Sequence, residues 1–163
     1  MVCGRLTSVK SPKGQDEHFM REALREAQKA SEADEVPVGA VIVQGGRLVA
    51  RAHNQMRTLK DPTAHAEMIA LTQACAHSEA ERLPDSVVYV TLEPCPMCVG
   101  AMVLARVGRL VFGAREKKTG ACGSVIHLLA EGKWPHRFRI EEGLLEFESS
   151  ALLQEFFRKK RPR

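Results

Sequence analysis

The run Val87-Val-Tyr-Val-Thr-Leu-Glu-Pro-Cys-Pro-Met-Cys98 joins the signals of a buried strand to those of a helix start. Residues 87–92 are almost continuously apolar, a pattern typical of a strand that is covered on both faces. Pro94 then favours a helix start, because the first turn of a helix does not need the N–H that proline lacks. The run therefore predicts a central strand followed at once by a helix with two cysteines near its beginning.

The segments before this run predict a helix, a hairpin and a second helix. Residues 16–33 have apolar side chains at helical spacing, and residues 38–44 and 47–52 flank a two-glycine turn, as in a β-hairpin. Asp61-Pro62 combines a capping side chain with a proline, which indicates another helix start. We expect that helix to run to about Ala76, with these residues facing inward: Ile69, Thr72, Cys75 and Ala76.

Beyond the run, we expect strands at residues 110–112 and 137–140 and a C-terminal helix. The inner face of that helix is predicted to carry Leu152, Leu153, Phe156 and Phe157. The order helix, hairpin, helix, strand, helix, strand, helix predicts an α/β fold in which helices are layered on one sheet. Because the hairpin strands are antiparallel, the five-stranded sheet must be mixed.

The chain length and composition are those of one globular domain. We place this domain at residues 16–163 of the 163, with residues 1–15 as a flexible N-terminal extension. A hydrophobic content of 44% and a charged content of 27% exclude a disordered chain, a collagen-like fibre and a coiled coil. The sequence has no apolar run near the roughly 18 residues that span a bilayer and no secretory signal. We therefore expect a cytoplasmic protein with no membrane association.

The formal net charge of +4 is concentrated at the C-terminus. Five of the 24 Lys and Arg residues lie in the last six positions, so the rest of the chain is close to neutral. A basic tail of this kind often follows a nucleic-acid backbone. A solvated, frayed chain end would have the same composition.

Two short motifs carry the candidate chemistry: His65-Ala-Glu67 and Pro94-Cys-Pro-Met-Cys98. Each lies near a predicted helix start, where free N–H groups and a partial positive charge favour thiolates. Cys95 and Cys98 are three residues apart, so both sulfur atoms can reach one ion, and His65 adds a nitrogen ligand. Three protein ligands leave a fourth tetrahedral position for water, which is the arrangement of catalytic zinc.

Glu67 is the candidate proton carrier of this site. It lies two residues beyond His65, roughly 200° around a helix, and so does not share the ligand face. From the first helical turn its carboxylate can reach toward the bound water, take its proton and pass it to a leaving group. Zinc lowers the pKa of its water from about 15.7 toward about 7, so hydroxide is available at neutral pH.

Two other interpretations fit parts of the pattern. A Cys95-x-x-Cys98 pair between a strand and a helix also describes a thioredoxin-type redox site, but the His-x-Glu motif at a second helix start favours a metal. A purely structural zinc would need a fourth protein ligand, which Cys122 or His53 could supply. The odd number of five cysteines argues against a disulfide framework.

His-x-Glu followed by Pro-Cys-x-x-Cys is the signature of zinc-dependent nucleobase deaminases. The sequence further resembles the bacterial tRNA-specific adenosine deaminases, the TadA family, over roughly residues 16–161. The blocks that carry this resemblance are Val36-Pro-Val-Gly-Ala-Val41, Asp61-Pro-Thr-Ala-His-Ala-Glu67, Val90-Thr-Leu-Glu-Pro-Cys95, Met97-Cys98, Gly100-Ala-Met102, Val111-Phe-Gly-Ala-Arg115, Lys118-Thr-Gly-Ala121 and Phe156-Phe-Arg158.

The resemblance implies hydrolytic deamination of the wobble adenosine to inosine in the tRNA anticodon loop, with one Zn²⁺ per subunit. His65, Cys95 and Cys98 match the zinc ligands of the family, and Glu67 matches its proton donor. The resemblance also implies a three-layer α/β/α cytidine-deaminase-like fold and a homodimer that contacts the anticodon stem-loop with both subunits. It points to these residues as substrate contacts: Asn54, Glu116, Lys118, Phe157, Arg158 and Lys160.

Several alternatives remain beside this resemblance. Asn54 could instead cap a turn, and Glu116 stands where the family commonly has aspartate, which bears on the ribose contact and not on the reaction. A free nucleobase deaminase acting on guanine or cytosine would keep the same zinc site, but a neutral base does not require the basic tail. An RNA-binding module with a structural zinc would have no use for Glu67.

Overall fold

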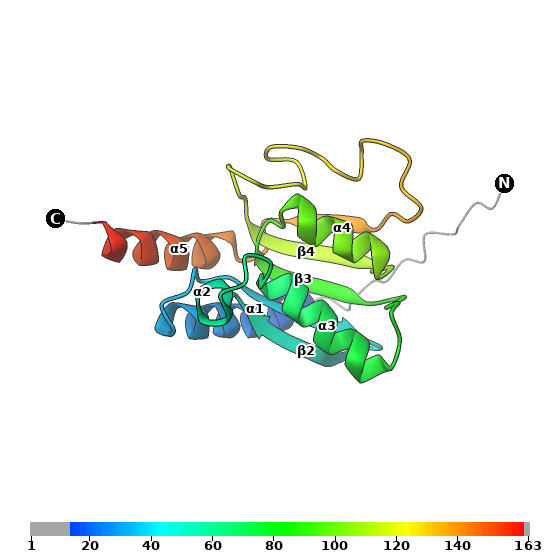
Figure 1. The fold of residues 1–163 in the computed structure, drawn as a ribbon, viewed down its shortest axis with the longest axis horizontal. Coiled ribbons are helices and arrows are strands. Elements are labelled where there is room, and N and C mark those ends of the chain that lie inside the picture. Colours follow the sequence, from blue (N-terminus) through cyan, green and yellow to red (C-terminus); the bar gives the residue numbers. More distant parts are fainter. Residues whose placement is uncertain (1–13, 162–163) are drawn as a thin grey trace.

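Five strands form one sheet in the computed structural model, which describes residues 14–161 (Figure 1). The strands are β1 (Gly39–Gln44), β2 (Arg47–His53), β3 (Val87–Leu92), β4 (Arg109–Ala114) and β5 (Arg139–Glu142). Their order across the sheet is β2-β1-β3-β4-β5. β1 is antiparallel to β2 and β3, whereas β4 is parallel to β3 and β5, so the predicted mixed sheet is confirmed.

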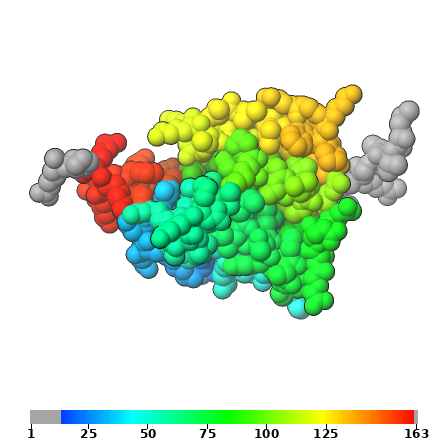
Figure 2. All heavy atoms as spheres, viewed as in Figure 1, coloured from blue at the N-terminus to red at the C-terminus, as the bar shows by residue number. Residues whose placement is uncertain are grey.

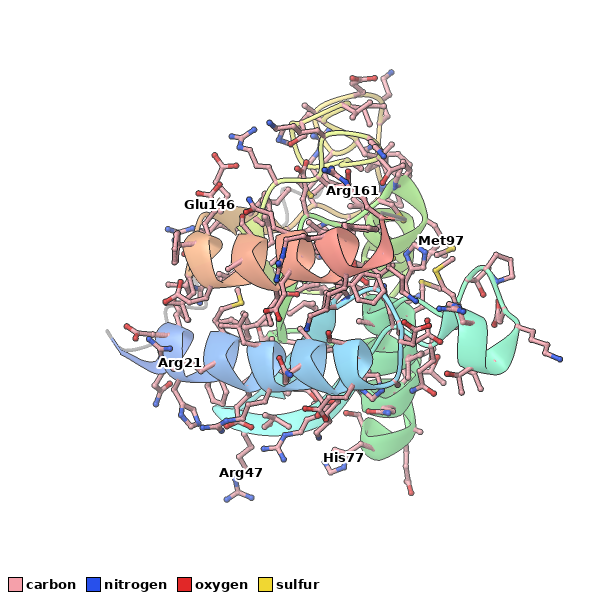
Figure 3. The ribbon with its side chains drawn as sticks, turned by 90° about the vertical axis from the view of Figure 1, so that its left-hand side faces the viewer. Arg21, Arg47, His77, Met97, Glu146 and Arg161 are labelled. Atoms are coloured by element: carbon pink, nitrogen blue, oxygen red, sulfur yellow. The ribbon has the colours of Figure 1, made fainter. Side chains whose placement is uncertain are left out.

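Helices cover both faces of this sheet. They are α1 (Gln15–Glu32), α2 (Met56–Leu59), α3 (Ala66–Ser78), α4 (Pro96–Leu104) and α5 (Glu146–Lys160). α1 and α5 lie side by side on one face, and α3 and α4 lie together on the other (Figures 1 and 3). Figure 2 shows the face formed by α3 and α4, with α5 (red) projecting at one end of the molecule. The expected three-layer α/β/α architecture is therefore confirmed.

The alternation of side chains along the strands divides the core into two layers. On β3, Tyr89 packs in the cluster that includes α1, whereas Val88 and Val90 pack in the cluster that includes α3 and α4. All three side chains are fully buried. Successive residues of a strand point to opposite faces, and here both faces are covered, which explains the continuous apolar run of this central strand.

The helix expected after Asp61-Pro62 begins later than predicted. Asp61 Oδ1 instead accepts hydrogen bonds from the backbone N–H and the hydroxyl of Thr63, at 2.8 and 2.7 Å, and closes a turn. α3 starts only at Ala66, with His65 as its cap residue. The helix that follows β3 also begins later than predicted, because α4 starts at Pro96 and not at Pro94. The short helix α2 was not predicted.

The predicted inner faces of two helices are partly wrong. On α3, Thr72 and Ala76 are exposed, and the buried residues are Ala66, Glu67, Ala70, Leu71 and Ala74. The small alanine side chains let α3 pack closely on β1 and β2, so the inner face follows the alanines. On α5, Phe156 is buried, but Phe157 is half exposed.

Residues 1–13 and 162–163 lie outside the described part of the chain, and with them most of the predicted extension and Arg163. Gln15, which the sequence assigned to the extension, is the first residue of α1. Between residues 14 and 161, no helix is both long enough and apolar enough to cross a membrane.

Glu35 ties the loop after α1 to the short helix α2. Its buried carboxylate accepts hydrogen bonds from the backbone N–H groups of Arg57 and Thr58, at 3.2 and 2.7 Å, and from the Thr58 hydroxyl at 2.9 Å. Burial alone raises the pKa of a carboxyl group, but these hydrogen bonds outweigh it and lower the pKa of Glu35. The position of α2 therefore depends on a side chain from a distant segment.

We expect Glu35→Gln to lower the free energy of unfolding at pH 7 by about 1 kcal/mol and to weaken its acid dependence. The pKa of Glu35 is lower in the folded protein than the value of 4.5 for the free side chain, so its stabilisation is complete above about pH 4.5. This contribution is lost as the pH falls through the folded-state pKa. Urea unfolding at pH 7 and pH 4 measures both effects, and equal acid dependence in variant and wild type would contradict the assignment.

Candidate metal centre and active site

Three side chains from two helix starts converge on one point. His65 Nδ1 lies 3.7 Å from Cys95 Sγ and 3.5 Å from Cys98 Sγ, and the two sulfur atoms are 3.7 Å apart. Zinc bonds of about 2.3 Å to sulfur and about 2.0 Å to nitrogen give tetrahedral edges of about 3.5 to 3.8 Å. The donor set therefore fits a tetrahedral metal site, and residues 14–161 contain no other group of three such donors.

The backbone at the two helix starts presents these donors. His65 and Cys95 are the N-terminal cap residues of α3 and α4, both in extended conformation, and Cys98 lies in the first turn of α4. The hydrogen bond between the two sulfur atoms, together with the one to His65, lowers the pKa of Cys95 to about 4. The thiolate, which is the form that binds metals, is therefore present at neutral pH.

Glu67 lies in the first turn of α3 and is only 4% exposed. Burial raises the pKa of its carboxyl group to about 7. With His65 and Cys95 it lines a cavity of about 160 Å³, which is smaller than the roughly 300 Å³ at which pockets for larger ligands begin. The cavity thus suits a single ring system beside a carboxyl group that can gain or lose a proton near pH 7.

Asn54 caps the start of a helix, where the alternative from the sequence was a turn cap, and it also lines the cavity. Its Oδ1 accepts a hydrogen bond from the backbone N–H of Ala66 at 2.8 Å, which caps the start of α3. The side chain is buried and borders the cavity with Glu67. Its Nδ2 has no partner in the part of the chain that the structure describes, so this N–H remains available to a molecule in the cavity.

Glu93, which no sequence pattern singled out, organises the loop beside the cavity. This buried residue follows β3 directly, and its carboxylate accepts hydrogen bonds from the backbone N–H groups of Glu116, Cys122 and Ser124 at 3.0, 2.9 and 3.1 Å. The Ser124 hydroxyl also donates to it. Burial alone raises the pKa of such a group, but these bonds lower the pKa of Glu93. A fixed negative charge therefore holds both ends of residues 116–124.

Gly120 makes this close approach of loop and carboxylate possible. A Cβ atom at Gly120 would lie 2.4 Å from the backbone oxygen of Glu116 and 2.5 Å from Cδ of Glu93. Any larger residue would push the loop away from the cavity. The signals in the sequence were an acidic residue directly after a buried strand and a glycine-rich loop, but their pairing is not visible there.

The remaining predicted substrate-binding residues fall into two groups. Glu116 lines the cavity, and its Oε1 accepts a hydrogen bond from the backbone N–H of Lys118 at 2.8 Å, while the Lys118 side chain is exposed. Phe157, Arg158 and Lys160 lie near the end of α5 and do not line the cavity. The structure thus brings the metal donors together with Glu67, Asn54 and Glu116, and leaves the basic helix end outside.

Neither residue considered as a fourth protein ligand reaches the three donors. His53 Nδ1 lies 2.9 Å from Glu26 Oε2, on the side of the sheet covered by α1. Cys122 is buried in the loop that Glu93 holds. Within residues 14–161, neither belongs to the donor group. Three protein ligands beside a cavity are the arrangement of a catalytic metal, whereas a structural zinc is enclosed by four.

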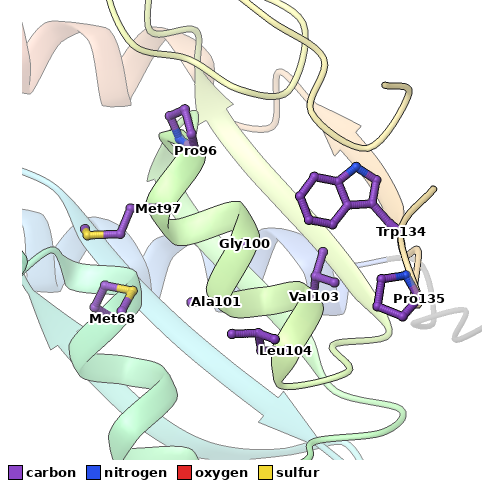
Figure 4. A pocket seen from close by; sticks show the side chains of 9 residues that line it. All are labelled: Met68, Pro96, Met97, Gly100, Ala101, Val103, Leu104, Trp134 and Pro135. Atoms are coloured by element: carbon purple, nitrogen blue, oxygen red, sulfur yellow. The ribbon is translucent and has the colours of Figure 1, made fainter. Parts of the chain in front are cut away.

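An apolar groove of about 440 Å³ runs along the outer side of α4 (Figure 4). Met68 of α3, Met97 and Leu104 of α4, and Trp134 line it. Leu104 is 76% exposed. A second apolar depression, of about 480 Å³, shares Met68 and Leu104 and continues between α3 and α4. The two depressions thus place partly or fully exposed apolar side chains of α3 and α4 next to each other.

Comparison with known proteins assigns the chain to a family. A family model described as MafB19-like deaminase matches residues 14–161. The tRNA-specific adenosine deaminase of Bacillus subtilis (strain 168) is 47% identical over 147 residues, which cover 90% of this chain and 91% of that protein. The tRNA-specific adenosine deaminase of Aquifex aeolicus (strain VF5) is 49% identical over 145 residues, which cover 89% and 95%.

Solved structures extend the comparison. A structure from a study of A-to-I editing by tRNA:A34 deaminases at the wobble position has a TM-score of 0.81 and 46% identity, covering 83% of this chain and 99% of that one. A guanine deaminase from Nitrosomonas europaea has a TM-score of 0.73 and 27% identity, covering 86% and 83%. The fold is therefore shared with a free-base deaminase, but the sequence identity is far higher to the tRNA enzymes. This chain belongs to the family of tRNA-specific adenosine deaminases.

Proposed function

We propose that the protein hydrolytically deaminates the wobble adenosine of the tRNA anticodon loop to inosine, in the cytoplasm and with zinc as its metal. The observation that carries this proposal is the buried, protonatable Glu67 beside three metal donors in a cavity that suits one base. The relatives that are 47% and 49% identical to this chain are named for the same activity.

His65, Cys95 and Cys98 would hold the zinc ion. Their mutual distances of 3.5 to 3.7 Å fit its tetrahedral geometry, and thiolate and imidazole are its usual ligands. When bound, zinc supplies the Lewis acidity that makes water a nucleophile at neutral pH. The low pKa of Cys95 means that this ligand is already a thiolate, whereas Cys98, whose pKa the same sulfur–sulfur hydrogen bond raises, would give up its proton when the metal binds.

Glu67 moves the proton in this proposal. A carboxyl group with a pKa of about 7 can accept a proton from the attacking water and return it to the leaving amine, so that ammonia departs. Asn54 would orient the base. Its Oδ1 is held by the N–H of Ala66, which leaves Nδ2 as the donor to the nucleoside.

Two observations favour adenosine in RNA over a free base. The small cavity can recognise the base itself, but Lys118, Arg158 and Lys160 are exposed cations outside it. RNA loops are bound by placing an unstacked base in a pocket beside a cationic surface, whereas free guanine or cytosine would not use these charges. The structure of a free guanine deaminase shares only 27% identity with this chain.

We further propose that the protein is a homodimer joined through the apolar groove of α3 and α4. In a monomer this groove, including the 76% exposed Leu104, would face water. Pro96 and Met97, which also line the groove, are neighbours of Cys95 and Cys98 in the chain. A second subunit would therefore lie close to the cavity, where it could contact the same RNA.

A competition assay tests the reaction. Zinc-loaded protein is mixed with an anticodon stem-loop that carries a wobble adenosine, together with free guanine and free cytosine, and the products are identified by mass. We expect inosine in the RNA and no change in either base. A deaminated free base beside intact RNA would contradict the substrate and leave the metal chemistry in place.

Glu67→Gln should keep the metal and lose turnover. The amide cannot carry the proton, so we expect the deamination rate to fall by about 10²- to 10⁴-fold while one zinc ion per chain is retained. Glu79→Gln, at the opposite end of α3, is the matched control and should be unaffected. Metal analysis and initial rates measure both properties, and a variant with nearly wild-type turnover would exclude this role of Glu67.

Leu104→Lys should produce a monomer, because a charged side chain at the centre of an apolar interface cannot be desolvated without cost. Phe147→Lys is the control, since Phe147 is 83% exposed but lies on α5, across the sheet. Light scattering measures the molecular mass. A wild-type monomer would contradict the dimer, and a Leu104→Lys dimer would place the interface elsewhere.

A further inference from the structure

Asp34 joins two cations from distant parts of the chain. It lies in the loop that follows α1, and its carboxylate pairs with Arg57 of α2 and with Lys160 of α5. The backbone oxygen of Asp34 also accepts a hydrogen bond from Arg57 Nη1 at 2.9 Å. α1 and α5 lie side by side with their C-terminal ends pointing the same way, where Arg161 is labelled in Figure 3. The end of α5 is thereby brought next to the loop after α1.

Two members of this three-residue cluster are close in the chain to residues that line the cavity. Arg57 directly follows Met56, and Asp34 stands two residues before Val36; both Met56 and Val36 line the cavity. Buried Glu35 fixes the backbone here, since it accepts the N–H of Arg57 at 3.2 Å. The backbone of Arg57 is therefore held next to the cavity-lining Met56, and its side chain extends from there to Asp34.

Stability does not explain why the three charges meet. Arg57, Lys160 and Asp34 are all exposed, and ion pairs between exposed side chains contribute little to folding because water and salt screen them. Arg57 and Lys160 come from two different helices and share one carboxylate. The two cations therefore form a site for an anion, and the Asp34 carboxylate is the anion that occupies it. A phosphate group offers several oxygens that match the fork of an arginine and the ammonium of a lysine together.

We propose that Arg57 and Lys160 together bind one backbone phosphate of the RNA whose adenosine enters the cavity, and that this phosphate displaces the Asp34 carboxylate. This subsite rests on the proposed function. Displacement of the resident anion lowers the affinity for every RNA backbone by the same factor. Discrimination among RNA molecules is then left to the base in the cavity, and the product RNA is not held by its phosphates alone.

RNA binding measured as a function of salt tests the two cations. Zinc-loaded protein with Glu67→Gln, which binds the anticodon stem-loop without consuming it, is the background for all variants. Each lost phosphate contact should reduce the slope of log affinity against log salt by about 0.7 to 1. We expect this full reduction when Arg57→Gln and Lys160→Gln are combined, because the two cations share one phosphate, and a smaller reduction for each single variant. Arg21→Gln, which removes an exposed cation paired with Glu17 on α1, should leave the slope unchanged.

Asp34→Asn tests the displaced anion. It should raise RNA affinity by about two- to fivefold at low salt, the range that corresponds to one exposed ion pair. This gain should vanish when Arg57 and Lys160 are both glutamine. Glu17→Gln is the matched control, because the side chains of Glu17 and Asp34 are both 53% exposed and both pair with arginine. Thermal unfolding verifies that every variant folds.

The possible outcomes separate the subsite from the function. Unchanged slopes for Arg57→Gln and Lys160→Gln would refute the phosphate site, and weaker binding by Asp34→Asn would show that Asp34 orders the cations and does not compete for them. Inosine formation by the unmodified protein with either of these results would refute the subsite alone. An unmodified protein that forms no inosine in the stem-loop would refute the proposed function together with the subsite.

Discussion

The candidate site depends on two helices that begin at the same edge of the sheet. β3 ends at Leu92, and Cys95 caps α4 three residues later. His65, which lies in the segment that follows β2, caps α3. Each residue of a helix turns by about 100°, so a shift of either start by one residue would carry a donor away from the shared point. The bond from Asn54 to the first N–H of α3 and the proline at the first position of α4 hold these starts in place.

Two buried carboxylates near these helix starts have opposite pKa shifts because their surroundings differ. Four N–H and O–H groups donate to Glu93, so its charge is stabilised and its pKa is lowered. Glu67 lacks such a set of donors, so burial dominates and its pKa rises to about 7. Of the two acids, the one with a permanent charge holds a loop in place, and the one that can change its charge faces the cavity with the metal donors.

The sequence predicted the three metal donors and the central strand because short patterns mark them. His65-Ala-Glu67 and Cys95-x-x-Cys98 each stand near a predicted helix start, although they are 30 positions apart, and a continuous apolar run is typical of a strand that is covered on both faces. The inner face of α3 was mispredicted because small side chains surround much of that helix, and only its close packing on β1 and β2 selects the buried ones. Glu93 was missed because its donors lie 23 to 31 positions later in the chain, and no local pattern distinguishes it from another acidic residue between a strand and a helix.

The shared fold cannot decide between a free base and a base in RNA, since a guanine deaminase has the same architecture. The cavity suits a single base in either case, so the distinction between a free base and a base in RNA has to be made at its rim. Two rim segments, the loop over residues 116–124 and α2, are each held by a buried acid that accepts their backbone N–H groups: Glu93 holds the loop and Glu35 holds α2. These bonds fix the backbone from which the charged side chains of the rim extend. Only a substrate that continues beyond the base, as a polynucleotide does, can contact the rim and Glu67 at once.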